Sequence, residues 1–197
     1  MTIAVIFGSQ RMGGKSKEIK NAMLRYQDDF NFDFIHLAEK KVEGCTDCRC
    51  CAQKGYCVLR NSDNDCFQTI FEKMQKADAI FIISPVYAGI PSRLTALFER
   101  LISVLFYTRK INTNQNPLLN KKVAVFSYCS AGVCDESPIK LICDKFFMKD
   151  YRFDQTTHIY LNSLPDPRTR YDNITNYVTD TLELLKQQIY KSKIGGR

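Results

Sequence analysis

Two hydrophobic patterns alternate along the chain. Segments that are apolar at nearly every position are typical of parallel strands buried on both faces, and segments with an apolar residue every three or four positions are typical of helices. The first pattern predicts strands at residues 3–7, 32–37, 79–84, 123–127 and 158–161. The second predicts five helices. The first carries Tyr26 and has Ser16 as its N-cap, and the next starts near Asp63, where the segment SDND at residues 62–65 offers capping candidates. The others cover residues 92–107, 137–147 and 174–189. Residues 108–120 are predicted to be an exposed connection.

This alternation favours an α/β fold in which helices cover both faces of a parallel sheet. The chain has 197 residues and no linker or internal repeat, so a single domain over residues 1–197 is expected. In such folds ligands bind beyond the carboxyl ends of the strands. The loops at residues 8–16, 84–91 and 127–134 are therefore expected to meet and to form the binding site.

An anion-binding loop is predicted where the first strand ends, in the segment GSQRMGGKS at residues 8–16. Glycines let the backbone approach a ligand closely, and the following helix begins with N–H groups that have no intrahelical partners. Ser9 and Ser16 add hydroxyl donors, and Arg11 adds a planar charged fork that suits phosphate. The alternative is a polar connection that binds nothing.

The loop differs from the P-loop of nucleotide hydrolases, although it ends in the letters GKS. The pattern G-x-x-x-x-G-K-[ST] requires a glycine where this chain has Ser9. A hydrolase also needs a metal-binding Asp at the end of a later strand, whereas the strand at 79–84 continues into Pro85. The dinucleotide fingerprint G-x-G-x-x-G is absent because Gln10 takes the place of its second glycine. The loop is therefore predicted to bind a phosphate monoester rather than a nucleoside triphosphate. Magnesium-dependent ATP binding would instead support a nucleotide hydrolase.

Five of the nine cysteines lie in a cysteine-rich loop at residues 44–58. Four of them form the frame C-x2-C-x2-C-x5-C, namely Cys45, Cys48, Cys51 and Cys57, and Cys50 is an additional thiol. Two-residue spacers let successive thiolates converge on one centre, as in ferredoxin-type cluster loops. Structural zinc more usually takes two separated cysteine pairs. Three interpretations of this loop therefore stay open: an iron–sulfur cluster, free or redox-active thiols, and a zinc site.

Charge and composition exclude several kinds of partner. The formal charge is +7, but the basic residues are scattered rather than arranged in a stripe with aromatics, so no nucleic-acid partner is expected. No segment has the length and apolarity of a signal peptide or membrane span, which favours a cytoplasmic protein without a membrane partner. Cysteines in that compartment are more often metal ligands or redox thiols than structural disulfides. His36 and His158 lie at ends of predicted strands and are expected to be packing or surface residues rather than catalytic bases.

Together, these motifs resemble the flavodoxin-like NAD(P)H-dependent FMN reductases and, within them, the iron–sulfur flavoprotein branch. Residues 8–16 match the pattern G-S-x-R-x-x-G-x-[ST] that holds the FMN phosphate in that family, and the letters SPVY at 84–87 match its S-P-[VI]-Y contact with the isoalloxazine ring. Residues 127–132 resemble the third flavin loop less closely. The resemblance covers residues 2–162 and implies a three-layer sandwich with five parallel strands in the order 2-1-3-4-5.

The resemblance also implies which residues form the sites, with the flavin rather than a side chain carrying the chemistry. The implied cofactor-binding residues are Ser9, Arg11, Gly14, Ser16, Pro85, Val86, Tyr87, Ala88, Gly89, Ser130 and Gly132. The implied ligands of a [4Fe–4S] cluster are Cys45, Cys48, Cys51 and Cys57. Two residues depart from the family pattern. Ala88 replaces a bulkier residue, which should open one flavin face, and Gln10 replaces a common proline in the phosphate loop.

The implied function is an FMN oxidoreductase that takes hydride from NAD(P)H and passes electrons to a quinone, a flavin, a metal ion or a protein partner. A homodimer is implied, with the helix at 92–107 and the loop after it as candidate interface. The alternative is a flavodoxin-like electron carrier without a small-molecule substrate. Steady-state NAD(P)H oxidation separates the two, because a carrier should show little of it.

Overall fold

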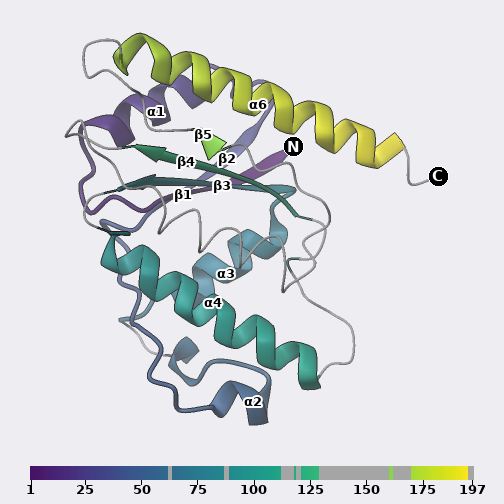
Figure 1. Cartoon of the computed structure of the whole chain (residues 1–197). Coiled ribbons are helices and arrows are strands. Elements are labelled where there is room, and N and C mark those ends of the chain that lie inside the picture. The colour runs from purple at the N-terminus through teal and green to yellow at the C-terminus, as the bar shows by residue number, and fades with distance from the viewer. Residues whose placement is uncertain are drawn as a thin grey trace.

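A parallel sheet of five strands in the order β2-β1-β3-β4-β5 forms the centre of the molecule (Figure 1). The computed structural model describes residues 1–61, 64–86, 89–111, 118, 121–128, 160–161 and 170–194. The strands are β1 (Thr2–Phe7), β2 (Asn31–His36), β3 (Ala79–Pro85), β4 (Lys122–Tyr128) and β5 (Tyr160–Leu161). Every neighbouring pair is parallel, which confirms the predicted α/β fold and strand order.

Helices cover both faces of this sheet (Figure 1). They are α1 (Lys15–Leu24), α2 (Cys50–Lys54), α3 (Phe67–Lys76), α4 (Ser92–Ile111) and α6 (Arg170–Ile194), with a 3₁₀ turn, η1, at Val58–Asn61. On one face α1 and α6 pack around Ile3, Val5 and Phe7, and on the other α3 and α4 pack around Ala4 and Ile6. Successive side chains of a strand point to opposite faces, so β1 serves both cores. This is why its sequence is apolar without alternation.

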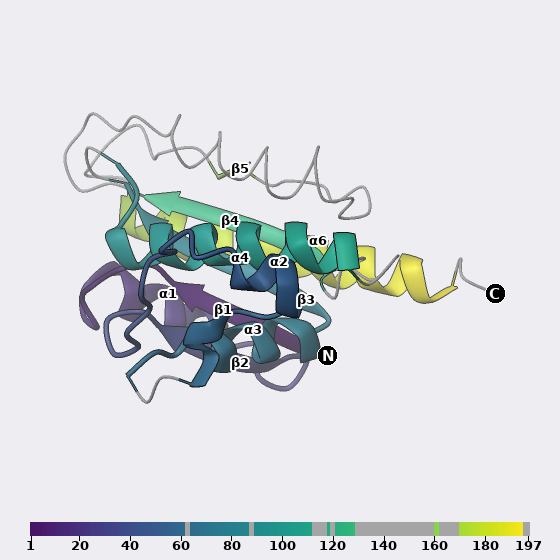
Figure 2. The same cartoon turned by 90° about the horizontal axis from the view of Figure 1, so that it is seen from below.

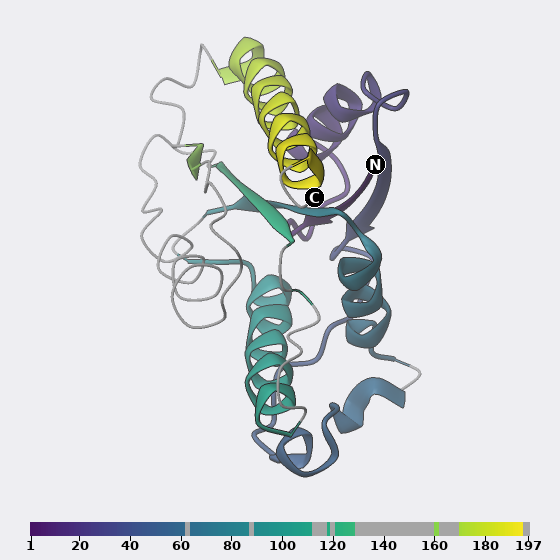
Figure 3. The same ribbon diagram turned by 90° about the vertical axis from the view of Figure 1, so that its right-hand side faces the viewer.

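The cysteine-rich segment lies apart from the sheet, beside α4. The short helix α2 packs against α4 and overlaps it when the molecule is seen from below (Figure 2). Figure 3 shows this segment at the opposite end of the molecule from α6. Helix α4 contacts both the end of the sheet and the cysteine-rich segment. Its residue Ser92 contacts the loop after β1, while Arg100, Ser103 and Val104 line a pocket with the cysteines.

Two predicted helix boundaries differ from those observed around α1 and α4. Helix α1 begins at Lys15 with Gly14 as its N-cap, so the prediction that Ser16 caps the helix is wrong. Ser16 instead lies buried in the first turn. Helix α4 continues to Ile111, so residues 108–111, predicted as part of a connection, are helical. No glycine or proline interrupts this stretch, and the helix ends only where the asparagine-rich segment begins.

Helix α3 also begins later than predicted, at Phe67 rather than near Asp63. The turn η1 occupies part of the preceding stretch. Asp65 Oδ1 accepts a hydrogen bond from the Phe67 N–H at 3.0 Å, so this carboxylate satisfies a free donor of the helix from two residues before it. The acidic signal was correct, but the residue that acts is Asp65, the last of the predicted capping candidates.

Several predictions fall outside the described residues, among them the helix at 137–147 and the placement of His158. Of the predicted fifth strand, Tyr160 and Leu161 are described and pair with Val125 and Phe126 of β4. None of the helices described here combines the length and apolarity needed to cross a lipid bilayer.

Candidate functional site

The carboxyl ends of β1, β3 and β4 meet at one edge of the sheet, as predicted. The Gly8 N–H, just after β1, donates to the Ile83 carbonyl of β3 at 2.7 Å. The Val86 N–H, just after β3, donates to the Tyr128 carbonyl at the end of β4, also at 2.7 Å. These bonds hold three strand ends in register, so the loops that follow them start from a rigid base.

Gly8 is required at this edge by close packing. A Cβ at this position would lie 2.8 Å from Leu94 Cδ2 and 3.4 Å from the Ile83 carbonyl oxygen. Leu94 belongs to α4 and is fully buried, so its side chain has little room to move. Gly8 therefore lets the first turn of α4 pack directly on the end of β1.

The end of the loop provides an open backbone cradle at the N-terminus of α1. Gly14, the N-cap, has φ 61° and ψ −136°, a conformation that side-chain-bearing residues rarely adopt. A Cβ at Gly13 or Gly14 would meet no atom within 4 Å. The first N–H groups of a helix and its dipole both favour an anion in such a position. The cradle therefore has the space and the polarity for a phosphate group.

The predicted phosphate-binding side chains belong to the same loop as this cradle or to the first turn of α1. Ser9 and Ser16 are buried, whereas Arg11 is exposed. Ser9 Oγ accepts a hydrogen bond from the Arg11 N–H at 3.1 Å, which stabilises the turn that carries the arginine. The Gln10 side chain donates to Ser92 Oγ at 2.8 Å and so ties the loop to α4. This bond gives the loop an anchor at the position where the family pattern has proline.

Tyr128 is a candidate site residue that was not among the predicted cofactor-binding residues. Its hydroxyl lies 3.4 Å from Ser16 Oγ, so the last residue of β4 reaches the first turn of α1. The sequence signal for it was its place at the end of a buried strand, inside the predicted third loop at residues 127–134. A phenol there can orient the Ser16 hydroxyl toward a bound anion.

The predicted flavin-ring loop is described only in part. Pro85 ends β3 and is buried, Val86 is buried with its N–H bonded to Tyr128, and Gly89 is partly exposed. The other predicted contacts, Tyr87, Ala88, Ser130 and Gly132, lie outside the described residues.

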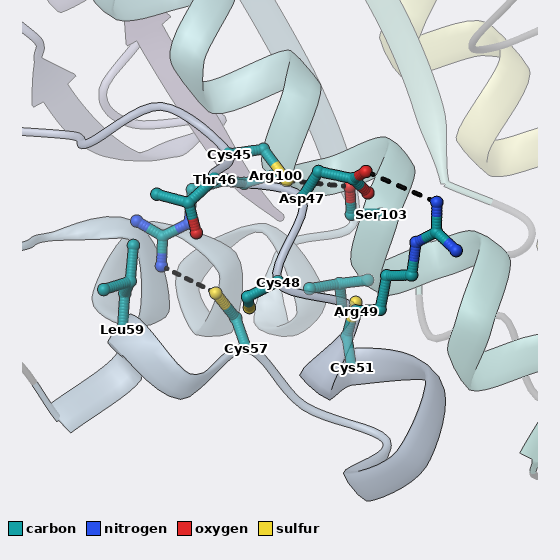
Figure 4. Close-up of a pocket in the computed structure, with 11 residues that line it drawn as sticks. Cys45, Thr46, Asp47, Cys48, Arg49, Cys51, Cys57, Leu59, Arg100 and Ser103 are labelled. Carbon is teal, nitrogen blue, oxygen red and sulfur yellow. Dashed lines mark hydrogen bonds and ion pairs between the residues drawn. The ribbon is translucent and has the colours of Figure 1, made fainter.

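The four framed cysteines, Cys45, Cys48, Cys51 and Cys57, line a single pocket (Figure 4). Helix α4 contributes its wall, since Ser103 Oγ lies 3.3 Å from Cys45 Sγ and Arg100 Nη2 donates to Cys57 Sγ at 3.3 Å. The loop folds back on itself through Asp47 and Arg49, which have φ of 48° and 55°. Positive φ in residues other than glycine is uncommon and marks a tightly constrained segment.

The electrostatics of the thiols differ within the pocket. Hydrogen bonding from the Cys50 backbone, and then from its side chain, lowers the pKa of Cys48. Burial raises the pKa of the Cys51 thiol, and the neighbouring Cys45 and Cys57 raise it further when they are ionised. Such mutual repulsion among thiolates is removed when a cation binds between them.

The donor set of this pocket fits an iron–sulfur cluster in its chemistry. Thiolate sulfur is the soft ligand that such clusters take, and four framed sulfurs share one pocket. Within the described ranges, however, no three Cys, His, Asp or Glu side chains are already arranged to hold a single metal ion. The pocket therefore offers the ligands, and its side chains would have to converge when the group binds.

A buried ion pair between Arg100 and Asp65 lies next to the cysteine pocket. Arg100 Nη1 lies 2.5 Å from Asp65 Oδ2, and both side chains are almost completely buried. The guanidinium also stacks over the Phe67 ring at 4.2 Å. Asp65 Oδ2 accepts the Glu43 N–H at 2.8 Å, just before the cysteine loop. The prediction missed this pair, although an arginine within the apolar stripe of a helix signals a buried partner.

His36 packs in the sheet, as predicted. Its ring stacks on Phe7 with centroids 4.3 Å apart. Burial lowers the pKa of His36, and the charge of Lys20 lowers it further. A neutral ring is thus favoured.

Comparison with known proteins identifies the family. The profile of the NADPH-dependent FMN reductases matches residues 1–136, which include β1 to β4 and the cysteine-rich segment. The chain belongs to this family. The matched region is the amino-terminal part of this FMN reductase family member.

Curated relatives add the name of a branch. The chain is 34% identical over 105 residues to an iron–sulfur flavoprotein of Methanosarcina thermophila, an alignment covering 52% of this chain and 53% of that protein. It is 30% identical over 100 residues to an iron–sulfur flavoprotein of Archaeoglobus fulgidus, covering 49% and 44%. The chain thus spans about half the length of the curated relatives it matches.

Solved structures share the fold. A flavone reductase has a TM-score of 0.66 at 16% identity, covering 94% of this chain and 63% of that one. An NAD(P)H:quinone oxidoreductase from Methanothermobacter marburgensis has 0.59 at 16%, covering 90% and 95%. Oxidised flavodoxin 1 from Bacillus cereus has 0.51 at 10%, covering 93% and 98%. At such identities the similarity shows the flavodoxin-like fold alone.

Proposed function

We propose that this protein is an FMN-dependent oxidoreductase that takes hydride from NAD(P)H and passes electrons to a quinone, a flavin, a metal ion or a protein. The observation that carries the proposal is the open cradle at Gly13 and Gly14, placed at the N-terminus of α1 in a member of the FMN reductase family. Bound FMN supplies two-electron chemistry toward nicotinamides and one-electron chemistry toward metal centres.

The residues of the chain bind and orient that cofactor. The Ser9 and Ser16 hydroxyls, the backbone at Gly14 and the Arg11 guanidinium hold its phosphate, and Tyr128 orients Ser16. Pro85, Val86 and Gly89 shape the rim near the ring. Tyr87, Ala88, Ser130 and Gly132 complete that rim in the proposal.

FMN and riboflavin titrations test the phosphate site, because the two ligands differ only in the phosphate. We expect Arg11→Ala to weaken FMN binding roughly 10- to 100-fold and to leave riboflavin binding unchanged, as loss of a charge-assisted contact predicts. Arg25→Ala is the matched control, since Arg25 is an exposed arginine at the other end of α1. Equal loss of both ligands in Arg11→Ala would contradict the assignment.

We further propose that Cys45, Cys48, Cys51 and Cys57 hold a [4Fe–4S] cluster. The common pocket and its sulfur donors support this, as does the relatives' name. Anaerobic protein should contain close to four iron and four sulfide per chain. Serine variants of these four cysteines should lose iron, whereas Cys50→Ser, in the same loop but outside the frame, should keep it. Iron-free wild-type protein would return the loop to the free-thiol or zinc reading.

Catalysis distinguishes the reductase from an electron carrier. Steady-state NAD(P)H oxidation with a quinone, free flavin or ferric acceptor is expected, and a flavodoxin-like carrier would show little of it.

We also propose a cytoplasmic homodimer that uses α4, where Ile102 is 40% exposed. Light scattering of Ile102→Asp would then report a shift toward monomer.

A further inference from the structure

Arg100 differs from the other cations near the cysteine pocket in its burial and in its contacts. Its side chain is 1% exposed, it is paired with Asp65, and its Nη2 donates to Cys57 Sγ at 3.3 Å. Its Nε–H is also buried and has no acceptor among the described residues. By contrast, Arg49 is 72% exposed and its contact with Asp47 is long, at 3.6 Å. Figure 4 shows Arg100 reaching Cys57 from the α4 side.

We propose that Arg100 is the positioning residue of the cysteine pocket, which fixes the Cys57 sulfur and stabilises the reduced form of a cluster bound there. The proposal rests on the [4Fe–4S] assignment made above. It assigns to this chain a residue outside the cysteine frame that sets the reduction potential of the site.

The charge balance gives the direction of the effect. Four thiolates around a [4Fe–4S]²⁺ core would carry a net charge of −2, and one electron, from reduced FMN or from a chemical reductant such as dithionite in a titration, would make it −3, with no bond formed or broken. A buried N–H donor and a buried cation stabilise the more negative state more strongly, because low local polarity strengthens both interactions. Hydrogen bonds to sulfur and net charge are established determinants of cluster potentials. Arg100 should therefore raise the potential.

Asp65 explains how the guanidinium is held in place. Its carboxylate binds Arg100 Nη1 and also accepts backbone N–H groups from Glu43 and Phe67. The planar fork of arginine lets one nitrogen bind the carboxylate while another faces Cys57. The carboxylate offsets part of the arginine charge at longer range. The direct N–H···S contact is therefore the larger contribution of Arg100 to the reduction potential of the cluster.

The test is a redox titration of the cluster in anaerobic holoprotein, followed by electron paramagnetic resonance. Arg100→Gln should make one-electron reduction at least tenfold less favourable, a shift of about 59 mV to lower potential. Arg60→Gln is the matched control, because Arg60 lies in η1, just after Cys57, but is exposed and stacks on Tyr56 at 3.4 Å. A change below twofold in Arg100→Gln, or an equal shift in Arg60→Gln, overturns the proposal.

A second variant guards against misfolding, because removing one partner of a buried pair leaves an unpaired charge. Asp65→Asn combined with Arg100→Gln removes both charges together with the N–H···S contact. It should also lower the potential, but by less than Arg100→Gln alone, because loss of the carboxylate charge offsets part of the loss of the guanidinium charge. Loss of iron from either variant, with FMN content and circular dichroism unchanged, also supports the positioning role. Wild-type protein without iron refutes the cluster assignment itself and this inference with it, whereas iron-loaded variants with wild-type potentials refute only the role of Arg100.

Discussion

Replacing Gly8 with alanine is expected to destabilise the fold by steric overlap at the edge of the sheet. The added Cβ would lie 2.8 Å from Leu94 Cδ2, about 1 Å inside the usual carbon–carbon contact distance. Leu94 is fully buried, and Gly8 is tied to Ile83 through its N–H, so neither side can withdraw freely. Overpacking of this kind costs about 1–3 kcal/mol. For a chain of this size, that lowers the melting temperature by roughly 2–12 °C.

Urea denaturation followed by circular dichroism measures this loss, and a second glycine of the same loop provides the control. Gly13→Ala should leave the unfolding free energy unchanged or raise it by up to about 1 kcal/mol, because its Cβ meets no atom within 4 Å. A double-mutant cycle identifies the cause. If Gly8→Ala clashes with Leu94, then Leu94→Val should recover part of the loss, with a coupling of about 1 kcal/mol. Equal stability of the two alanine variants, or strict additivity in the cycle, would refute the steric reasoning.

Three further outcomes are expected. Burial lowers the pKa of His36, and the unfolded chain takes up this proton near pH 6.5, so stability should fall as the pH drops below about 6.5. His36→Gln should show a flatter pH dependence in denaturant titrations at pH 5.5–7.5, and an equally steep one would contradict this cause. Lys121 donates to the carbonyls of Gln75 and Ala77 at the end of α3, so Lys121→Met should lower the unfolding free energy by about 1–2 kcal/mol. Thermal denaturation measures this loss, and an unchanged melting temperature would contradict the role of these two bonds. Tyr128→Phe should weaken FMN binding roughly 2- to 10-fold in a fluorescence titration, and an unchanged affinity would remove this hydroxyl from the site.

The sheet could be predicted because its cause is local and repeated. A strand such as β3 is buried at every residue, and this requires an unbroken apolar sequence that few other structures share. The position of the loop between β1 and α1 could be predicted for a similar reason, since its glycines and polar residues stand directly between a strand and a helix, whereas its phosphate-binding role stays a prediction. Helix ends were harder to predict. Ser16 has the chemistry of an N-cap, yet the backbone of Gly14 starts the helix two residues earlier.

The contacts that hold the cysteine pocket depend on residues distant in sequence, and this limits what a pattern can show. Asp65 was predicted as a capping residue, and one of its oxygens does accept the Phe67 N–H. Its other oxygen pairs with Arg100, 35 residues later, and no periodicity relates those two positions. The apolar stripe of α4 nevertheless contains a clue, because Arg100 lies one turn from Leu97 and Val104, both buried. A charge in such a stripe requires a partner, and only the fold shows that its partners are a carboxylate and a cysteine sulfur.

Helix α4 therefore has a role that its hydrophobic pattern does not reveal. Through Ser92 it anchors the phosphate loop, and through Arg100 and Ser103 it contacts the cysteines, so the two proposed redox sites share one rigid element.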